Sequence, residues 1–478
     1  MAPTITVDVG TTSVKMCAFD ATGTILSSAR VTTPTMRDGI GEIYDTAALE
    51  SAVRDFCRGL DAHVIDSIER VAFAGVGESG GLVRPDLSLA SPMVLWHDQR
   101  GARYLQRLTD AQQARLSAIT GLPVNANYGL SKVRWAVDHA ADAHGAVWLN
   151  ISEYLAARLT GVRWSEFSLA SRTMALDLKS RSWSAEACGL VGLDVRWFPK
   201  LRAAADGLPI DDAAAARCGL GNTVMVHVAG HDHMVGSVGA TQSPGEMLNS
   251  TGTTEGLLVL SDEWDSGPAS RDAKLAGGIS PAGSDFTLFA SIPTGGSAFA
   301  TLQSMLGFDA ASLTETVSRL HRQYLSGEID LGRVPLILPR FRGSPPPDKD
   351  PRALGAVAGL RDDTTRDDIV FGCFLGLVLQ FADVLALFPD PPRTIKVIGP
   401  VSANPLWLQL KADVLGTRLL ASELDEVVSR GAQAIASGPR GEAAAPWRDV
   451  SHDHQRHAAL TEWIEARRQL WSLLKETS

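Results

Sequence analysis

The sequence has little cysteine and lacks long basic runs and long uncharged apolar runs. Its five cysteines among 478 residues are scattered and contain no C-x-x-C pair. This usage argues against a disulfide framework and a zinc site, and it fits a reducing compartment. MAPTITVDVG does not resemble a signal peptide, and no uncharged apolar stretch reaches membrane-spanning length. We therefore expect a cytoplasmic protein without a membrane partner.

The charge balance is acidic. Lys and Arg together number 44 against 54 for Asp and Glu, which gives a net charge of -10. Nucleic acid is therefore not an expected partner, because its phosphates require a basic surface. Hydrophobic residues make up 45% and charged residues 21%, as in ordinary globular proteins. The length predicts two to four domains.

The pattern of strands and helices predicts an α/β protein with an internal repeat. ITVDVGTTSVKMCAFDATGTIL alternates around Gly10-Thr11-Thr12 and predicts a β-hairpin, and RVAFAGV and MVLWHD predict two further strands. MLNSTGTTEGLLVL repeats the first hairpin about 240 residues later. The repeat indicates two domains of similar topology with a cleft between them. We place their boundary after Gln242, which gives residues 1–242 and 243–478. Residues 458–474 predict one long helix.

The two Gly-Thr-Thr turns are candidate phosphate-binding segments. Glycine lets the backbone approach a ligand, and a turn presents several N–H and hydroxyl donors together. Each turn alone is also explained as an ordinary tight turn. Asp8 lies just before the first turn, where a carboxylate could hold Mg²⁺ beside a phosphate.

Asp232 lies where the apolar strand of VMVHVAGHDHMVGSVGA runs into a small-residue helix. It is either a helix N-cap or a general base at the carboxyl end of a strand, and the spacing alone favours neither. His231 and His233 are better explained as pocket lining than as a zinc pair. In GPVSANPLW, N-capping explains Asn404 completely. The small residues from Gly431 to Ala436 would let a helix pack closely.

The run AFAGVGESGGLV contains the G-x-S-x-G spacing of a serine hydrolase around Ser79. A hydrolase elbow requires a helix directly after the nucleophile. Pro85 and Pro92 follow instead, so we do not expect Ser79 to be a nucleophile.

Taken in order, these segments resemble the FGGY carbohydrate kinases of the sugar kinase, actin and Hsp70 superfamily. The resemblance rests on VDVGTTSVKMCAFD, WHDQR, SEYLAARLTG with SLASRTMALDL, AGHDHMVGSVGA, STGTTEG and GPVSANPLWLQLKADVLG. It covers almost the whole chain and implies two ribonuclease-H-like (actin-like ATPase) domains. The function it implies is transfer of the γ-phosphoryl group of MgATP to a sugar or polyol, with a ketopentose such as xylulose as the first expectation.

The resemblance also implies roles for particular residues. Asp232 matches the catalytic general base, and Asp8 and Asp232 match the Mg²⁺ site. The implied nucleotide-binding residues are Thr11, Thr12, Ser13, Lys15, Gly252, Thr253, Gly295, Gly399, Pro400 and Asn404. The implied substrate-binding residues are Glu78, Ser79, Gly80, Trp96, Asp98, Asn127, Asp232 and His233. The alternative is a degenerate member that binds sugar and nucleotide without catalysis, and a homodimer is left open.

Two positions depart from the family pattern. Pro400 replaces the second of two consecutive glycines, which removes an N–H and biases Gly399 towards an extended conformation. Ser79 and Gly80 replace larger sugar-binding side chains. We expect open space there, and hence a bulkier or differently decorated substrate.

Overall fold

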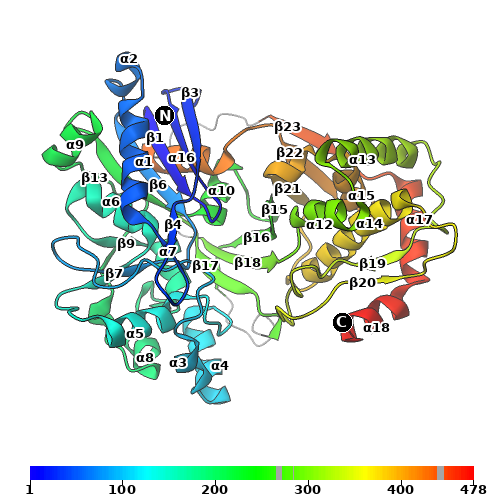
Figure 1. Ribbon diagram of the computed structural model, residues 1–478, viewed down its shortest axis with the longest axis horizontal. Coiled ribbons are helices and arrows are strands. Elements are labelled where there is room, and N and C mark those ends of the chain that lie inside the picture. The colour runs from blue at the N-terminus through cyan, green and yellow to red at the C-terminus, as the bar shows by residue number, and fades with distance from the viewer. Residues whose placement is uncertain (265–271, 284, 439–445, 478) are drawn as a thin grey trace.

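The computed structural model describes residues 1–264, 272–283, 285–438 and 446–477. It consists of two α/β halves, each built on one large sheet (Figure 1). The first sheet has the order β13(Leu208–Pro209), β14(Met225–His231), β6(Arg70–Gly75), β1(Thr4–Val9), β2(Ser13–Phe19), β3(Ile25–Thr32). The second has the order β17(Ala276–Ile279), β18(Phe286–Ile292), β16(Glu255–Ser261), β15(Glu246–Thr251), β21(Thr394–Ile398), β22(Arg418–Ser422), β23(Trp447–Val450).

Helices and small strand pairs surround these sheets. The helices of the first half are α1(Thr46–Arg58), α2(Ala62–Ile65), α3(Ala102–Gln106), α4(Asp110–Thr120), α5(Gly129–His139), α6(Ile151–Thr160), α7(Phe167–Ala170), α8(Ala185–Leu190), α9(Asp212–Cys218) and α10(Asp232–Gly239). Those of the second half are α12(Ser297–Leu306), α13(Ala310–Leu325), α14(Arg366–Leu385), α15(Pro405–Leu415), α16(Val427–Ser437), α17(His454–Glu465) and α18(Arg468–Thr477). The short 3₁₀ helices are η1(Ser171–Thr173), η2(Val195–Trp197) and η3(Pro400–Ala403). The short strands are β4(Thr35–Arg37), β5(Glu42–Tyr44), β7(Gly81–Val83), β8(Val147–Leu149), β9(Trp164–Glu166), β10(Leu176–Asp177), β11(Ser182–Trp183), β12(Lys200–Arg202), β19(Leu336–Leu338) and β20(Ala356–Ala358).

The two sheets repeat one topology, which confirms the predicted internal repeat and the two-domain α/β fold. In the first sheet β1 pairs antiparallel with β2 and parallel with β6, and β6 pairs parallel with β14. In the second sheet β15 pairs antiparallel with β16 and parallel with β21, and β21 pairs parallel with β22. The turn of each leading hairpin carries Gly-Thr-Thr. Every residue of β1 is buried, as expected for a central strand covered on both faces.

One helix from each half forms a close seam between the halves. In Figure 1 the orange helix α16 lies beside the blue strands of the first sheet, and it packs against α10, β6 and β1. A Cβ built on Gly431 of α16 would lie 2.1 Å from the carbonyl oxygen of Val235, and one on Gly239 of α10 would lie 2.0 Å from that of Val427. The small residues therefore do let this helix pack closely, and the close contact is with α10 of the first half.

Two predicted elements differ from the structure. MVLWHD forms no regular strand; Val94 pairs with Gly80 and with Ile43 as isolated bridges. The predicted tail helix is two helices, α17 and α18, whose residues Trp463 and Trp471 join the same buried cluster. The apolar periodicity correctly predicted helix, but it does not show where one helix ends and the next begins.

Helix α14 is long and apolar enough to span a membrane by length and composition, with a mean hydropathy of 1.9. However, 72% of that window is buried in the protein. Phe371, Phe374 and Leu375 are at most 1% exposed, as in the core helix of a large domain.

Candidate active site

The carboxyl ends of the parallel strands β1, β6 and β14 bring two carboxylates together. Asp8 of β1 pairs in register with Ala74 of β6, and Ala74 pairs with Gly230 of β14. Asp232 follows two residues later as the first residue of α10. Burial, and then the charge of Asp232, raises the pKa of Asp8 to about 7. The two carboxylates therefore interact directly through space.

Asp232 is held in its charged form. Burial acts to raise its pKa, but the neighbouring His233 and His231 and the backbone N–H of His233 more than offset this, and the net shift is downward. That N–H donates to Asp232 Oδ1 at 2.7 Å, and the N-terminus of α10 adds the favourable end of the helix dipole. Asp232 is therefore a carboxylate at neutral pH and can accept a proton.

A buried serine and glutamate support the strand end before Asp232. Ser168 Oγ accepts a hydrogen bond from the backbone N–H of His231 at 2.9 Å. Glu166 Oε2 in turn accepts from the hydroxyl of Ser168, and from the backbone N–H groups of Ser168 at 2.8 Å and Leu169 at 3.1 Å. Gly230, two residues before Asp232, has φ +123°, and a Cβ added there would lie 2.3 Å from Ser168 Oγ. No local pattern points to Glu166, and Ser168 is marked only by opening the SLASRTMALDL segment.

The first Gly-Thr-Thr turn is tied to the rest of the first half by three contacts. The Thr33 N–H donates to the Thr12 carbonyl at 3.1 Å, the Thr33 hydroxyl donates to the Gly10 carbonyl at 2.8 Å, and the Trp96 indole donates to Thr11 Oγ1 at 3.0 Å. Thr11 and Thr12 remain exposed. The turn is therefore held in place, while the Thr12 side chain stays exposed to a ligand.

Lys15 and His233 connect the first half to the second. Lys15, opposite Asp8 in the hairpin, forms an ion pair of 3.2 Å with Glu426 just before α16. His233 Nδ1 lies 2.7 Å from Ser250 Oγ on β15. The residues around Asp8 and Asp232 therefore face the second sheet directly.

The second Gly-Thr-Thr turn meets the start of α12. Gly295 N–H donates to the Thr253 carbonyl at 3.1 Å, and Gly296 N–H donates to the Gly252 carbonyl at 2.8 Å. A Cβ on Gly295 would lie 2.7 Å from the Thr254 backbone, whereas one on Gly252 would meet nothing within 4 Å. Gly252 therefore faces open space while Gly295 is packed behind the turn.

The segment around Pro400 corrects one expectation. Gly399 adopts φ +95° and ψ 177°, so its φ lies in the region that glycine tolerates and is not the extended value expected before proline. An added Cβ would lie 2.1 Å from the Thr251 carbonyl oxygen. Pro400 opens the helix η3, where a missing N–H costs little. Asn404 Oδ1 caps α15 by accepting from Trp407 N–H at 3.1 Å, while its Nδ2 is buried without a hydrogen-bond partner among the described residues.

The expected open space at Ser79 and Gly80 is absent. Ser79 is 1% exposed, and its hydroxyl lies 3.3 Å from Asn150 Nδ2 and 3.4 Å from the Val76 carbonyl. A Cβ on Gly80 would lie 2.5 Å from the Trp148 ring. Strand β7, not a helix, follows the serine, so no nucleophile elbow forms. Glu78 is the member of this trio within electrostatic range of Asp232 and His233.

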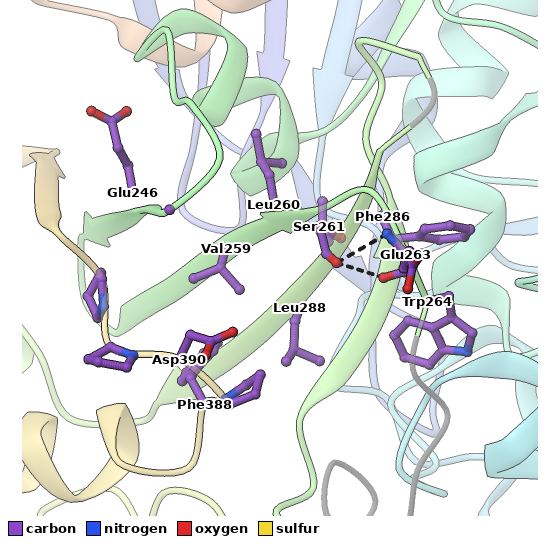
Figure 2. A pocket seen from close by; sticks show the side chains of 15 residues that line it. Glu246, Val259, Leu260, Ser261, Glu263, Trp264, Phe286, Leu288, Phe388 and Asp390 are labelled. Carbon is purple, nitrogen blue, oxygen red and sulfur yellow. Dashed lines mark hydrogen bonds between the residues drawn. The ribbon is translucent and has the colours of Figure 1, made fainter.

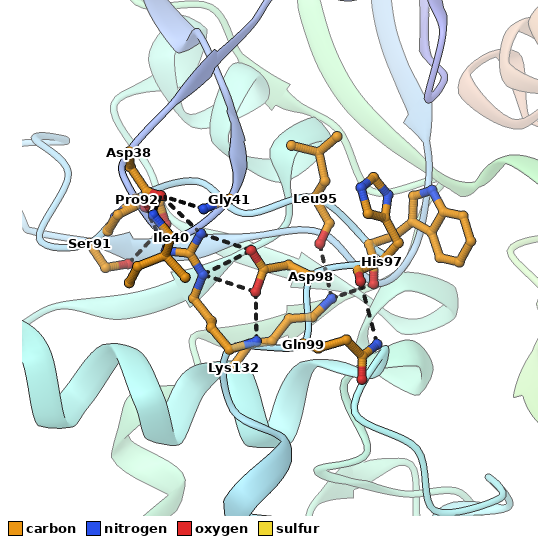
Figure 3. Close-up of polar contacts among 12 residues, drawn as sticks. Asp38, Ile40, Gly41, Ser91, Pro92, Leu95, His97, Asp98, Gln99 and Lys132 are labelled. Carbon is orange, nitrogen blue, oxygen red and sulfur yellow. Dashed lines mark hydrogen bonds and ion pairs between the residues drawn. The ribbon is translucent and has the colours of Figure 1, made fainter. Parts of the chain in front are cut away.

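Asp98 of the WHDQR segment and Asp38 (Figure 3) form a polar network with Arg100. Both Asp98 oxygens lie 2.9 Å from Arg100 Nε, and Arg100 Nη1 lies 2.7 Å from Asp38. Asp98 thus joins two loops through Arg100. The amide of Gln99 donates to Asn127 Oδ1, which holds Asn127 on the same side.

Lys132, which the sequence reasoning missed, lies beneath this network. It is 1% exposed and donates to the carbonyls of Glu78 at 2.8 Å, Leu95 at 3.1 Å and Trp96 at 2.6 Å. Burial lowers its pKa to about 7. Lysine in a helix carries no pattern that distinguishes such a role, although this one fixes the backbone of two predicted substrate segments.

A separate pocket lies at the ends of β16 and β18 that are distant from the second Gly-Thr-Thr turn (Figure 2). Its lining includes Trp264, Phe286, Phe388 and Asp390. None of the residues predicted for the site belongs to it, and Asp8 and Asp232 are absent from its lining. We therefore place the chemistry at the strand ends between the halves.

Two sheets of one topology, each with a Gly-Thr-Thr turn at its parallel strand ends and an aspartate pair between them, define a two-domain phosphotransferase of the actin-like fold. The chain belongs to the FGGY family of carbohydrate kinases, whose N-terminal domain matches residues 4–239 and whose C-terminal domain matches residues 247–437. The family uses ATP as phosphate donor and sugars or polyols as small-molecule acceptors.

Individual relatives agree on the family and differ in substrate. The chain is 26% identical over 449 residues to the xylulose kinase of Bacillus subtilis, covering 91% of this chain and 87% of that protein. It is 26% identical over 372 residues to the glycerol kinase of Bordetella parapertussis, covering 72% and 69%. The crystal structure of a xylulose kinase from Lactobacillus acidophilus superposes with a TM-score of 0.86 at 17% identity, covering all of both chains.

Proposed function

We propose that this protein transfers the γ-phosphoryl group of ATP to a hydroxyl of a sugar or polyol, with Asp232 as the general base. The observation that carries the proposal is the charged Asp232 beside Asp8, at strand ends that face the second sheet. Phosphoryl transfer requires mainly positioning and charge neutralisation, and the base needs only to reach the attacking hydroxyl.

Asp8 and Asp232 are the residues that would hold Mg²⁺. Asp8 Oδ1 is buried without a hydrogen-bond partner among the described residues, and the pKa of Asp8 is raised to about 7 by burial and the nearby carboxylate. A divalent cation would satisfy that oxygen and relieve the repulsion. Within the described ranges no group of three His, Cys, Asp or Glu side chains converges. A Mg²⁺ ion bound with the nucleotide would neutralise charge that develops during the transfer.

The nucleotide would lie along the two turns and η3. We propose that Thr11, Thr12, Ser13 and Lys15 bind phosphate from the first half, and that Gly252, Thr253 and Gly295 do so from the second. Gly399, Pro400 and Asn404 would bind the adenosine, and the free Asn404 amide supplies a donor there. Lys15 would exchange Glu426 for a phosphate oxygen.

The acceptor would lie against Glu78, Trp96, Asp98, Asn127 and His233 in the first half. Xylulose is the first candidate because the relative with 91% coverage is named for it. Ser79 and Gly80 would shape this wall only through their backbone, since the Ser79 side chain faces the core. We further propose a cytoplasmic protein of two domains, 1–242 and 243–478, that binds neither nucleic acid nor membrane; a homodimer is left open.

Purified protein with MgATP and a panel of ketoses, polyols and sugar acids tests the proposal through ADP release. Asp232→Asn should lower kcat by about 10²- to 10⁴-fold, the range expected for a general base, while acceptor binding persists. Ser79→Ala is the matched control, and it should keep kcat within about 3-fold because its hydroxyl makes only weak internal bonds.

The non-catalytic alternative predicts a different result. It requires acceptor binding, measured by thermal shift, without ADP release from any compound of the panel. Equal turnover by the wild type and Asp232→Asn would contradict the assignment of the base.

A further inference from the structure

A buried ion pair lies at the base of the second Gly-Thr-Thr turn. Glu255 is the first residue of β16 and follows the turn, and it pairs in register with Thr251, the last residue of β15. Its Oε1 accepts a hydrogen bond from Lys411 Nζ of α15 at 2.6 Å. The side chains of Lys411 and Glu255 are 1% and 0% exposed. The residue that closes the turn is therefore tied to a helix from a much later part of the chain.

Asn249 on β15 adds a second contact to the same lysine. Lys411 Nζ donates to Asn249 Oδ1 at 2.7 Å, and Asn249 Nδ2 donates to the Gly256 carbonyl on β16 at 3.2 Å. The ammonium also lies 4.0 Å from the ring centre of Phe381, a buried residue of α14. Lys411 therefore holds both strands of the hairpin against α15.

Stability alone explains this pair poorly. Burial lowers the pKa of Lys411, and the Glu255 carboxylate opposes that shift. Glu255 Oε2 is buried without a hydrogen-bond partner among the described residues. Withdrawing two charges from water offsets much of their attraction, and apolar side chains of similar volume often replace such a pair without loss of stability. The ion pair differs from apolar packing in fixing the direction and length of the contact.

The turn above the pair has little freedom to move independently. Residues 252–254 lie between the paired Thr251 and Glu255, and Gly252 N–H donates to the Thr254 carbonyl at 2.9 Å. A closed turn of this length moves with the strand ends that carry it. A shift of Glu255 would therefore shift the N–H groups and hydroxyls proposed to bind phosphate.

The helix that carries Lys411 begins at the segment proposed for adenosine. Helix α15 follows η3 directly, and Asn404 caps it by accepting from Trp407 N–H at 3.1 Å. Asn404 lies about two helical turns before Lys411. Between them, the buried Trp407 ring has its centre 5.1 Å from Lys411 Nζ. One short helix thus carries both the cap beside η3 and the lysine at the base of the phosphate turn.

We propose that Lys411 and Glu255 are positioning residues for the nucleotide, and that their ion pair sets the second phosphate turn at the distance from η3 that one nucleotide spans. The inference rests on the proposed function for the identity of the ligand. It adds two residues that are too buried to contact the nucleotide and that act through the backbone of the turn.

Paired substitutions separate stability from nucleotide affinity. Lys411→Met or Glu255→Met alone leaves a buried charge without its counter-ion, and each should lower the urea midpoint of unfolding. The double variant removes both charges and should recover most of that loss. Its Kd for MgADP, measured by calorimetry without an acceptor, should stay at least about 5-fold above the wild-type value, because apolar contact leaves the turn less precisely placed.

Lys396 and Glu246 supply a matched control in the same sheet. Their ion pair of 2.8 Å joins β21 to the first residue of β15, at the opposite end of that strand from the turn. Lys396 is also buried, with 7% of its side chain exposed. The double variant Lys396→Met/Glu246→Met should keep the Kd for MgADP within about 2-fold of the wild type.

Glu255→Asp tests the same inference in a variant that keeps both charges. Its side chain is shorter by one methylene group, so the turn must shift for the ion pair to form. We expect the Kd for MgADP to rise about 3- to 10-fold. A recovery of wild-type affinity in the Lys411→Met/Glu255→Met protein, wild-type affinity in Glu255→Asp, or equal weakening by the control pair would overturn the inference. Those results would leave the proposed function standing, whereas a wild-type protein that does not bind MgADP would overturn both.

Discussion

Glycines that look equivalent in the sequence have opposite surroundings in the protein. Gly80 has the Trp148 ring and the Leu149 carbonyl where its side chain would be. Gly252 has nothing within 4 Å. Because the first position is filled by the protein and the second is open, substitution should separate stability from ligand binding.

We predict that Gly80→Ala destabilises the protein while Gly252→Ala impairs nucleotide use. The Gly80 Cβ would approach Trp148 to 2.5 Å, and overpacking of this kind costs about 1–3 kcal/mol. Gly252→Ala should leave the urea midpoint nearly unchanged and raise the KM for MgATP by about 5-fold or more, since its methyl group projects into the proposed phosphate site. Urea unfolding and initial rates at varied ATP check both. A stable Gly80→Ala protein with altered acceptor preference would restore the idea of open space there.

At the residue scale, chain position could be predicted and orientation could not. The sequence placed Ser79 and Gly80 next to Glu78 correctly. The core-facing position of these two residues depends on Asn150 and Trp148, which lie about 70 positions later in the chain. Lys132 was missed because a lysine becomes informative only once its hydrogen-bond partners are known.

At the element scale, Asp232 depends on a support of buried carboxyl groups. Ser168 and Glu166 hold the β14 end on which α10 begins. Burial raises the pKa of Glu166 to about 8 and that of Glu153 to about 7. The sequence predicted the strand and the helix of this junction, but not the support from Glu166 at the end of β9 and Ser168 in the short helix α7, because elements this short carry no periodic pattern.

We predict a pH-dependent difference in stability between the wild type and Glu166→Gln. The ordinary pKa of glutamate, 4.5, applies to the unfolded chain, whereas the native value is about 8. Native Glu166 therefore binds more protons between these values, so its contribution is complete below pH 4.5 and is lost as the pH rises through 8. Glutamine does not titrate. The free energy of unfolding of the wild type relative to the variant should fall by more than about 1 kcal/mol from pH 5 to pH 9.

Urea unfolding at pH 5, 7 and 9 measures this difference. Glu462→Gln, at an exposed position on α17, is the control and should track the wild type at every pH. A difference between wild type and Glu166→Gln that does not vary with pH would show that Glu166 is ionised throughout. Its hydrogen bonds alone would then account for its role.

At the scale of the whole molecule, helix α16 and the residue before it join the two halves through direct contacts. Helix α16 belongs to the second half of the chain, yet Gln433 donates to the carbonyls of Ala2 and Asp20 in the first. Glu426 before it pairs with Lys15 and Arg30 of the first sheet. The repeat in the sequence predicted two similar domains. It could not predict these contacts between α16 and the first half, because they depend on how the domains are placed in space.

The α10–α16 seam should therefore couple stability to catalysis, and we predict that Gly431→Ala reduces both. Its methyl group would lie 2.1 Å from the Val235 carbonyl, which forces apart the helix that begins at Asp232 and the helix that follows Glu426. We expect a loss of about 1–3 kcal/mol in unfolding free energy, and a fall in kcat that persists at temperatures where the variant is fully folded. Gly189→Ala is the matched control, because α8 leaves open space at that position and alanine favours a helix. If Gly431→Ala is destabilised but its folded form keeps the wild-type kcat, the seam holds the halves together without positioning Asp232.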